Sequence, residues 1–375
     1  MIAGFFKKIL KSLPPKNLIL FESVPDLSDN TWPVFEEMIR RGMNKKYKFV
    51  WLVPDSKKEF PRIPNVSYID WKTRLARYRY AWYNWRAKAM VYCNVFIGKK
   101  TPKQFGIYLT HGTAIKDVGP YYNLANTDFD YVVTAGDGTN EFMAKALKIS
   151  PDRCIGLGFP RNDVLTAPPK DLHRFFEGDF QQVIVWYPTF RQHKNGMATG
   201  SSDALPILHD TEAAKRLNAV AKEAGVLIVV KPHFAQDVSY IKDYNLSNIR
   251  FIDDSFFAEN GLTSYEFVGS CDGMLSDYSS IYYDYLLCDK PVGLIWEDIE
   301  QYRQNPGFAV DMDYYMKGAE KLYTLAELES FVCGVARGDD PLKEARAEID
   351  RAVNCASDGQ NARRVVDFIV EKANL

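Results

Sequence analysis

The residues best suited to binding or catalysis lie in a serine-rich stretch from Ser276 to Pro291, directly after the short apolar segment 273–275. The pattern predicts a strand whose carboxyl end leads into a helix, and Pro291 ends that helix. Four side chains are candidates to cap it: Ser276, Asp277, Ser279 and Ser280. A helix N-terminus combines partial positive charge with unpaired N–H donors, so the stretch predicts an anion site, most often for phosphate. The plainer alternative is that these residues only cap the helix.

Two other predicted strand ends in the same half carry basic side chains. Arg191 closes the motif Tyr-Pro-Thr-Phe-Arg, which begins at the end of a strand predicted over 183–187. Lys231 ends a strand predicted over 226–231, and His233 follows it. Parallel strands bring their carboxyl ends to one edge of a sheet, where a guanidinium, an ammonium and helix N–H donors together suit a diphosphate. Taken singly, Arg191 is equally an ordinary surface arginine, and Lys231 is equally a lysine packed along apolar surface.

In the first half of the chain the strongest candidate is His111, which precedes Gly112 at a predicted strand end and is followed by Lys116. An isolated histidine is more often structural than catalytic. Here Gly112 permits a close approach of the backbone, and the carboxyl end of a strand is where α/β proteins place chemistry. The sequence therefore favours a functional role for His111.

Segments of strand length alternate with helical patterns along both halves of the chain. Strands are predicted over 18–21, 47–53, 131–134, 183–187, 226–231, 249–252 and 292–295, and helices over about 31–41, 137–147 and 211–224, with a short one near Ser264. This alternation is typical of mostly parallel sheets with helices on both faces, so we predict an α/β protein of two doubly wound, Rossmann-like domains. The loop 156–163 and the Pro168-Pro169 pair predict a boundary between 1–169 and 170–375, with the last helix free to pack back on the first domain.

The composition is that of a folded protein large enough for two cores, with 375 residues, 46% of them hydrophobic, and a formal net charge of −1. The six cysteines form no Cys-x-x-Cys pair and no signal peptide precedes them, so we expect reduced, buried thiols in a cytoplasmic protein. No cluster has the spacing of metal ligands, and neither a metal nor another cofactor is expected. Three histidines match no motif and are expected in loops or on the surface: His173, His193 and His209.

Two segments are candidates for contact with a membrane surface. The first is an amphipathic helix over 2–13, with apolar residues on one face and lysines on the other. The second is the run from Trp71 to Lys116, which contains no acidic residue and includes an aromatic, basic helix candidate over 71–90. Each segment has a plainer interpretation as a helix packed on its own domain. No apolar run reaches the roughly 18 residues that a membrane-spanning helix needs.

Five motifs, in this order along the chain, resemble those of the CDP-glycerol glycerophosphotransferase family, which includes wall teichoic acid primases and polymerases and related capsule enzymes. They are His111-Gly112-Thr113 with Lys116, Gly158 to Asp163 with Arg161, Tyr187 to Arg191, Lys231-Pro232-His233, and Ser276 to Ser280 with Asp284 and Lys290-Pro291. The resemblance implies a GT-B-type fold, two Rossmann-like domains facing across a cleft. It also implies that the first domain receives the acceptor at the membrane and that the second binds the CDP-alcohol donor.

The activity implied by the resemblance is transfer of glycerol phosphate from CDP-glycerol to a hydroxyl of a lipid-linked acceptor, with release of CMP, at the cytoplasmic face of the cell membrane. The two motif histidines, His111 and His233, are implied to be catalytic. We expect His111 to be the general base because it comes from the acceptor-side domain, and an exchange of the two roles stays open. The remaining motif residues are implied to bind substrate: Lys116, Arg161, Arg191, Lys231, Ser276, Asp277, Ser279, Ser280 and Asp284.

Other functions stay open beside this one. CDP-ribitol or another CDP-polyol is an alternative donor, and a GT-B glycosyltransferase that uses a nucleotide sugar has the same fold. A non-catalytic membrane scaffold is disfavoured by two histidines and two phosphate-ready loops at strand ends. No nucleic-acid partner is expected. The sequence leaves open the oligomeric state, the acceptor, and whether one unit or many are added.

Overall fold

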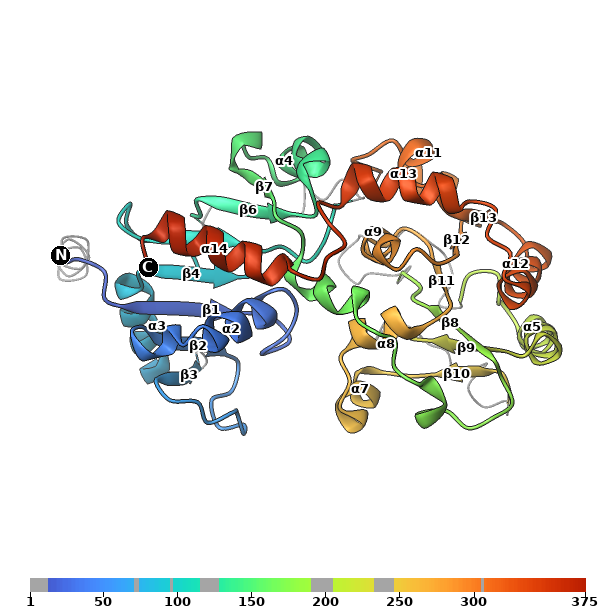
Figure 1. The fold of residues 1–375 in the computed structure, drawn as a ribbon, viewed down its shortest axis with the longest axis horizontal. Coiled ribbons are helices and arrows are strands. Elements are labelled where there is room, and N and C mark those ends of the chain that lie inside the picture. Colours follow the sequence, from blue (N-terminus) through green and yellow to red (C-terminus); the bar gives the residue numbers. More distant parts are fainter. Residues whose placement is uncertain are drawn as a thin grey trace. The chain divides into compact units, whose positions relative to one another are not determined.

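The computed structural model describes residues 13–70, 74–94, 97–114, 128–189, 205–232, 246–304 and 307–375. These residues form two compact α/β units, each built on one parallel sheet (Figure 1). The first unit contains the described residues up to Thr113, those from 128 to Asp163, and those from Asn354 to Leu375. The second contains Ala114 and the described part of Val164–Val353. The division after Asp163 lies close to the boundary predicted at residue 169.

Within the described residues, the first unit holds a seven-stranded parallel sheet in the order β3-β2-β1-β4-β5-β6-β7. The strands are β1 (Leu18–Glu22), β2 (Lys48–Val53), β3 (Val66–Asp70), β4 (Ala89–Tyr92), β5 (Phe105–Tyr108), β6 (Tyr131–Thr134) and β7 (Cys154–Gly156). The central strands β1 and β4 are buried along their whole length, as parallel strands covered on both faces are. The strand order reverses between β1 and β4, and open α/β sheets bind their ligands at such a point.

Helices of the first unit cover this sheet and include one from the far end of the chain. They are α2 (Thr31–Arg40), α3 (Arg74–Arg86), α4 (Asn140–Leu147) and α14 (Asn361–Ala373), with the 3-10 turns η1 (Met43–Lys45), η3 (Asp137–Thr139) and η4 (Pro151–Arg153). Helix α14, red in Figure 1, belongs to the first unit. Its Asp367 pairs with Arg41 at 2.6 Å, and its Phe368 packs edge-on against Tyr131. Helix α14 is thus part of the first unit.

The second unit repeats the plan with the strand order β10-β9-β8-β11-β12-β13 in its described residues. The strands are β8 (Gln182–Trp186), β9 (Val226–Val230), β10 (Ile249–Phe251), β11 (Gly273–Ser276), β12 (Val292–Ile295) and β13 (Glu320–Leu322). The helices are α5 (Thr211–Ala224), α7 (Asp254–Asn260), α8 (Ser264–Ser270), α9 (Ile281–Tyr285), α10 (Ile299–Gln304), α11 (Met312–Tyr315), α12 (Leu325–Arg337) and α13 (Lys343–Val353), with the 3-10 turns η6 (Leu172–Arg174) and η7 (Leu286–Cys288). Here the order reverses between β8 and β11, so the serine-rich stretch after β11 begins at this unit's reversal point.

The predicted fold class, two parallel-sheet Rossmann-like domains, is confirmed. The helix predicted over 71–90 is too long, because α3 ends at Arg86 and β4 begins at Ala89. The side-chain amide of Gln104 donates to the carbonyl oxygens of Asn84 and Ala87 at 2.7 and 2.9 Å, which satisfies the end of the helix from a distant part of the chain. Strands β3, β7 and β13 are not among the predicted strands, because only one residue of each is buried, and β7 and β13 have only three residues.

The structure describes part of the two segments predicted to contact a membrane. Among the described helices, none has the length and apolar character that crossing a bilayer requires. The segment over 2–13 lies, except for its last residue, outside the described residues. From the acid-free run, the structure describes residues 74–94 and 97–114.

The cysteines are free thiols in the structure. Cys93, Cys154 and Cys271 are buried as expected, and Cys288 and Cys333 are partly buried. The expectation of burial is wrong for the last one, Cys355, which is exposed. Within the described ranges, no group of three or more histidines, cysteines and carboxylates is placed to hold a metal ion.

Candidate active site

His111 lies in the bend that follows β5, at the carboxyl edge of the first sheet, with its side chain 36% exposed. Its Nδ1 is 2.6 Å from Oδ2 of Asp29, which lies in the loop after β1. The second oxygen of the same carboxylate, Oδ1, accepts a hydrogen bond at 2.7 Å from Arg161, in the 3-10 segment η5 (Pro160–Thr166). One aspartate thus joins the imidazole ring to a guanidinium group, and all three side chains belong to the first unit.

The charge of Asp29 is fixed by its surroundings. Burial by itself raises the pKa of this carboxyl, but the Arg161 guanidinium and the bond to His111 outweigh that effect and hold the pKa at about 2. Asp29 is therefore ionised at neutral pH. An ionised carboxylate accepts the Nδ1–H of a histidine, which leaves the lone pair of the neutral ring on Nε2. This is the arrangement in which histidine acts as a general base.

The reactive nitrogen of that ring already has a protein partner. Nε2 of His111 is 2.8 Å from Nδ2 of Asn94, which follows β4. With the proton on Nδ1, the Asn94 amide donates to Nε2. A substrate hydroxyl that approaches His111 must take the place of this amide. The second amide atom of Asn94, Oδ1, is buried and has no hydrogen-bond partner among the described residues.

Asn30 ties together the three loops that carry these groups. Its amide nitrogen donates to the carbonyl oxygens of Leu109 and Thr110, at 3.3 and 3.1 Å, just before His111. Its amide oxygen accepts the backbone N–H of Arg161 at 3.1 Å. Asp29 itself has a φ of 52°, in the left-handed region that aspartate and asparagine tolerate better than most residues. The loop after β1 is thus shaped and anchored so that one aspartate meets both His111 and Arg161.

A second carboxyl group lies beneath this cluster. Glu22, the last residue of β1, is 1% exposed, and its Oε2 accepts the backbone N–H of Asn94 at 3.0 Å. Burial, with smaller contributions from Asp26 and Asp29, raises the pKa of Glu22 to about 8. The first sheet therefore carries two carboxyl groups of opposite state at neutral pH, an ionised one on Asp29 and a neutral one on Glu22.

In the second unit, Ser276 and Asp277 hold two strand ends together. The hydroxyl of Ser276 donates to the carbonyl oxygen of Tyr187, after β8, at 3.0 Å. Asp277 accepts the backbone N–H and the hydroxyl of Thr189, at 2.8 and 2.5 Å. Both residues are buried. In this structure their polar atoms fix the loop after β8 rather than face outward as helix caps.

Asp284 also has a protein partner. It lies on α9, is 1% exposed, and accepts the hydroxyl of Tyr265 on α8 at 2.6 Å. This bond joins α8 to α9, the helices that precede and follow β11. Asp284 therefore holds the helix that follows the serines in place and does not present a free carboxylate at the surface.

Ser279 and Ser280 differ from these buried neighbours. Both are only partly buried, and neither hydroxyl makes a hydrogen bond to another described residue. Ser280 stands at the N-cap of α9 but makes no side-chain cap bond, so its predicted capping role is wrong. Because α9 runs only from Ile281 to Tyr285, its dipole is small, and an anion here would depend on the hydroxyls themselves.

Lys231 follows β9 at the same sheet edge. Its Nζ is 2.9 Å from Oδ1 of Asp254, the first residue of α7, and 5.8 Å from the centre of the Tyr187 ring. Asp254 is 82% exposed, and an ion pair with such a partner contributes little. The ammonium group of Lys231 is therefore available to exchange this carboxylate for a phosphate.

Three predicted site residues, Lys116, Arg191 and His233, lie outside the described residues. In the first unit the structure brings His111 and Arg161 together through Asp29, and in the second it brings Lys231, Ser276 and Asp277 to one sheet edge. Asp29 and Asn94 are not among the predicted residues. A signal for Asp29 exists in the sequence, since the loop 23–30 follows the first strand, where α/β sheets place ligands.

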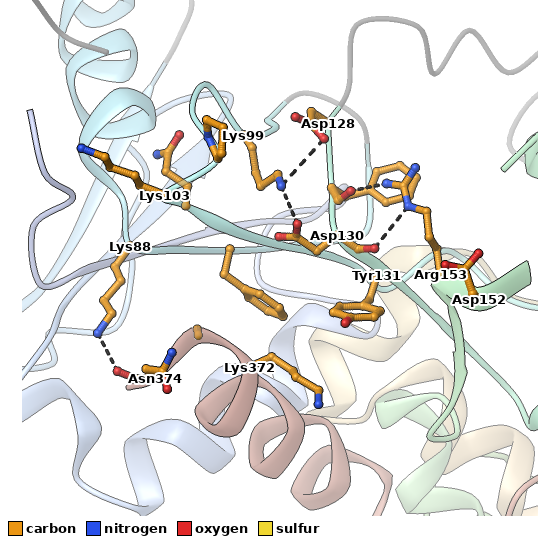
Figure 2. Close-up of a pocket in the computed structure, with 15 residues that line it drawn as sticks. Lys88, Lys99, Lys103, Asp128, Asp130, Tyr131, Asp152, Arg153, Lys372 and Asn374 are labelled. Carbon is orange, nitrogen blue, oxygen red and sulfur yellow. Dashed lines mark hydrogen bonds and ion pairs between the residues drawn. The ribbon is translucent and has the colours of Figure 1, made fainter. Parts of the chain in front are cut away.

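A separate hollow of about 650 Å³ lies at the amino ends of the strands of the first sheet, at the edge opposite His111 (Figure 2). Its walls carry charges of both signs, and most of them already have partners. Lys99 pairs with Asp130 at 2.5 Å, and Lys88 donates to the carbonyl oxygen of Asn374 at 2.6 Å. At the opposite edge of the sheet lie an ionised carboxylate, a histidine and an amide oxygen that has no hydrogen-bond partner among the described residues.

Comparison with known proteins gives one consistent family. The model of the family described as CDP-glycerol:poly(glycerophosphate) glycerophosphotransferase matches residues 5–371. A teichoic acid glycerol-phosphate transferase of Staphylococcus aureus (strain NCTC 8325 / PS 47) is 22% identical over 350 residues, which cover 83% of this chain and 82% of the relative. A teichoic acid ribitol-phosphate primase of Bacillus spizizenii (strain ATCC 23059 / NRRL B-14472 / W23) is 20% identical over 254 residues, 65% of this chain and 60% of the relative.

Solved structures agree on the fold. The wall teichoic acid polymerase TagF, in a variant soaked with CDPG, superposes with a TM-score of 0.74 at 18% sequence identity, over 100% of this chain and 98% of that chain. At this sequence identity the likeness concerns the fold alone.

Proposed function

The chain belongs to the CDP-glycerol:poly(glycerophosphate) glycerophosphotransferase family, and from that membership we propose that it transfers glycerol phosphate from CDP-glycerol to a hydroxyl of a membrane lipid-linked saccharide or polyol-phosphate acceptor, with release of CMP. The relatives are named for teichoic acid synthesis, and we assign this chain to that process. The 2.6 Å contact between Nδ1 of His111 and Asp29 is the main support for proposing His111 as the catalytic base. A histidine oriented by an ionised carboxylate is suited to that role.

The proposed reaction is a displacement at phosphorus. The acceptor hydroxyl oxygen bonds to the glycerol-bearing phosphorus of CDP-glycerol while the bond from that phosphorus to the bridging oxygen breaks, and CMP leaves with the bonding electrons. The hydroxyl proton passes to Nε2 of His111. Asp29, ionised and bonded to Nδ1–H, stabilises the imidazolium that forms. Asn94 gives up its place at Nε2 when the hydroxyl binds.

For the donor we infer a site at the carboxyl edge of the second sheet. Lys231 offers an ammonium group whose present partner is an exposed carboxylate, and Ser279 and Ser280 offer hydroxyls without a described protein partner. Arg191 and His233 continue from the ends of β8 and β9 and are proposed to add a guanidinium and an imidazole. Charge-assisted hydrogen bonds of this kind bind phosphate oxygens well.

The double substitution Ser279→Ala with Ser280→Ala is expected to weaken CDP-glycerol binding. A hydrogen bond to a charged group is worth about 1.5–3 kcal/mol, so the affinity should fall by roughly tenfold or more. Calorimetric titration measures this. The matched control is Ser247→Ala, which removes an exposed hydroxyl bonded to Asn248 before the amino end of β10, at the opposite edge of the second sheet. Unchanged affinity in the double variant would remove the donor-site assignment of this loop.

The proposed donor is tested by incubating the protein, with an acceptor, with CDP-glycerol, CDP-ribitol and UDP-sugars in turn. We expect CMP from CDP-glycerol at the highest rate. The ribitol alternative is supported by the similarity to a ribitol-phosphate primase, and preference for CDP-ribitol would select it. UDP release from a UDP-sugar would favour the glycosyltransferase alternative, and release from none of the donors would favour the scaffold.

We also propose that the protein binds the cytoplasmic face of the membrane, where a lipid-linked acceptor is held. Supporting this, α3 exposes Tyr78 and Trp82, at 66% and 44%, beside exposed arginines. The ammonium of Lys16 and the guanidinium of Arg86 lie over the Trp82 ring, 5.4 and 5.6 Å from its centre. Aromatic rings next to cations suit the interface of an anionic membrane.

Removing residues 1–13 is expected to loosen binding to anionic vesicles and to slow transfer to a lipid-linked acceptor, with activity on a soluble acceptor analogue nearly unchanged. Each cation near an anionic leaflet contributes about 1 kcal/mol, and the apolar helix face adds burial. Sedimentation with liposomes at rising salt measures the binding, which should weaken as charges are screened. Arg77→Glu with Arg79→Glu on α3 should act in the same direction, whereas Lys215→Glu with Lys222→Glu on α5 is the control. Equal pelleting of all proteins, insensitive to lipid charge, would overturn this part of the proposal.

A further inference from the structure

Glu22 and Asn94 form a continuous link to the proposed base. The carboxyl group of Glu22 accepts the backbone N–H of Asn94 at 3.0 Å, and the side-chain amide of Asn94 reaches Nε2 of His111 at 2.8 Å. On the other side of the ring, Nδ1 meets Asp29 at 2.6 Å. Four residues from the ends of β1, β4 and β5 are thus connected in a row across the reversal point of the first sheet. The position of Asn94, and with it the contact at Nε2, depends on Glu22.

The surroundings of Glu22 disfavour the ionised form of its carboxyl group. The residue is 1% exposed, and its Oε1 is buried with no hydrogen-bond partner among the described residues. The groups that face it are acidic or neutral, and no described lysine, arginine or histidine forms an ion pair with it. They are Asp26 and Asp29 after β1, Tyr80 on α3, and Tyr92 and Cys93 at the end of β4, with His111 and Arg161 reached through Asn94 and Asp29.

We propose that Glu22 is a positioning residue for His111. It holds the backbone of Asn94 so that the Asn94 amide can serve Nε2 of His111 in both protonation states of the ring. In the resting state Nδ2 of Asn94 donates to the lone pair of Nε2. After the substrate has left, while the ring still carries its proton, rotation of the amide presents Oδ1, which has no hydrogen-bond partner among the described residues, to Nε2–H. Because Glu22 accepts a hydrogen bond from the backbone N–H of Asn94, the side-chain amide of Asn94 can rotate while its backbone stays in place.

A neutral Glu22 also keeps the charge of the site low. The negative charge of Asp29 is balanced by Arg161, so Glu22 adds no further negative charge beside His111 as long as it holds its proton. Ionisation of Glu22 adds a buried negative charge beside His111 and opposes the phosphate-bearing substrates of the proposed reaction. Since burial and the nearby Asp26 and Asp29 raise the pKa of Glu22 to about 8, activity is expected to fall as the pH rises through about 8. This inference rests on the proposed function for its kinetic part only.

The first test follows the ring nitrogens of His111 by ¹⁵N NMR in the full-length protein without substrate, with the signals assigned through His111→Gln. In the wild type we expect the His111 signals to shift with an inflection near the pKa of Glu22, about 8. Glu22→Gln keeps an oxygen for the Asn94 N–H but cannot ionise, so this inflection should vanish. The control Glu320→Gln replaces a partly buried glutamate of the second unit whose pKa is also raised, and it should keep the inflection. Identical curves for the wild type and Glu22→Gln would overturn the proposal.

The second test is the pH dependence of kcat/KM for CMP release from CDP-glycerol with a soluble acceptor that carries a terminal glycerol phosphate. The decline at alkaline pH is expected in the wild type and absent in Glu22→Gln. Glu22→Ala should lower kcat by roughly tenfold, since one buried hydrogen bond is lost, and Glu22→Gln should recover most of that loss. A purely structural glutamate would leave the shape of the profile unchanged in Glu22→Gln.

The two tests fail in different ways. If His111 is not the base, the pH dependence of kcat/KM will be the same in the wild type and in Glu22→Gln, whereas the NMR signals of His111 will still differ between them. In that case the proposed role of His111 is wrong, and the positioning of Asn94 by Glu22 still holds. A measurement on the wild type alone covers the case in which the variants do not fold. With ¹³C-labelled glutamate, the Glu22 carboxyl carbon should give a protonated signal at pH 7, and an ionised signal at that pH would overturn the proposal.

Discussion

Replacing His111 by alanine is expected to lower turnover by about a hundredfold to ten-thousandfold, the usual contribution of a general base, while the fold is retained. The reason for retention is that His111 is 36% exposed in a loop after β5 and buries little apolar surface. His233→Ala, from a segment outside the described residues, is expected to abolish most turnover as well. Steady-state CMP release measures the effect, and circular dichroism verifies the fold.

The chain offers a matched control for this substitution. His209 in the second unit also contacts a carboxylate, with Nε2 2.5 Å from Oε1 of Glu297, and its side chain is 50% exposed. It belongs to no motif, so His209→Ala should leave CMP release nearly unchanged. A folded His111→Ala protein with CMP release close to that of the wild type would show that His111 is not the base and would return the role to His233.

Asp29→Asn is expected to have the next largest effect, a loss of kcat of roughly a thousandfold or more. The amide keeps the shape of the carboxylate but lacks its charge, and an amide N–H pointed at Nδ1 stabilises the tautomer with the proton on Nε2, in which the ring cannot accept a proton there. In catalytic triads the same change lowers kcat by about ten-thousandfold. Because the pKa of Asp29 is about 2, protonation of Asp29 should not limit the wild type at mildly acidic pH.

This effect should appear in kcat more than in KM, since Asp29 acts through His111 and not on the substrate. The control is Asp55→Asn, a carboxylate of the same unit that lies in the loop after β2 and accepts the backbone N–H of Lys57. A thermal melt verifies that the loss of the Arg161 contact leaves the first unit folded. If folded Asp29→Asn retains wild-type kcat, the 2.6 Å contact has no catalytic role.

Local patterns in the sequence predict most of the strands and helices, and they also identify His111. Buried parallel strands such as β6 and β12 are nearly continuous apolar runs, so their bounds can be predicted. His111 was identifiable because it follows such a strand. The strands β3 and β13 escaped prediction because only a few of their residues are buried, and their place depends on pairing with β2 and β12.

The partners of His111 could not be predicted from local patterns. Asp29 follows β1 and Asn94 follows β4. These two strands are neighbours only because the strand order reverses between them, and β5, which precedes His111, lies next to β4. The φ of 52° at Asp29, which turns its carboxylate toward His111, is likewise a property of the folded loop. For the same reason Ser276 and Asp277 resemble ligand groups in the sequence, whereas in the structure they bond to the loop after β8.

The most direct test of the central claim is to follow phosphorus during the reaction. With CDP-glycerol and a soluble acceptor, ³¹P NMR should show the diphosphate signals replaced by equal amounts of CMP and a new phosphodiester that joins glycerol to the acceptor, and His111→Ala should slow both together. This result is predicted because the acceptor hydroxyl attacks the glycerol-bearing phosphorus, and the bond to the bridging oxygen breaks. Release of CDP with no new phosphodiester, or CMP formed at the same rate in His111→Ala as in the wild type, would contradict the account.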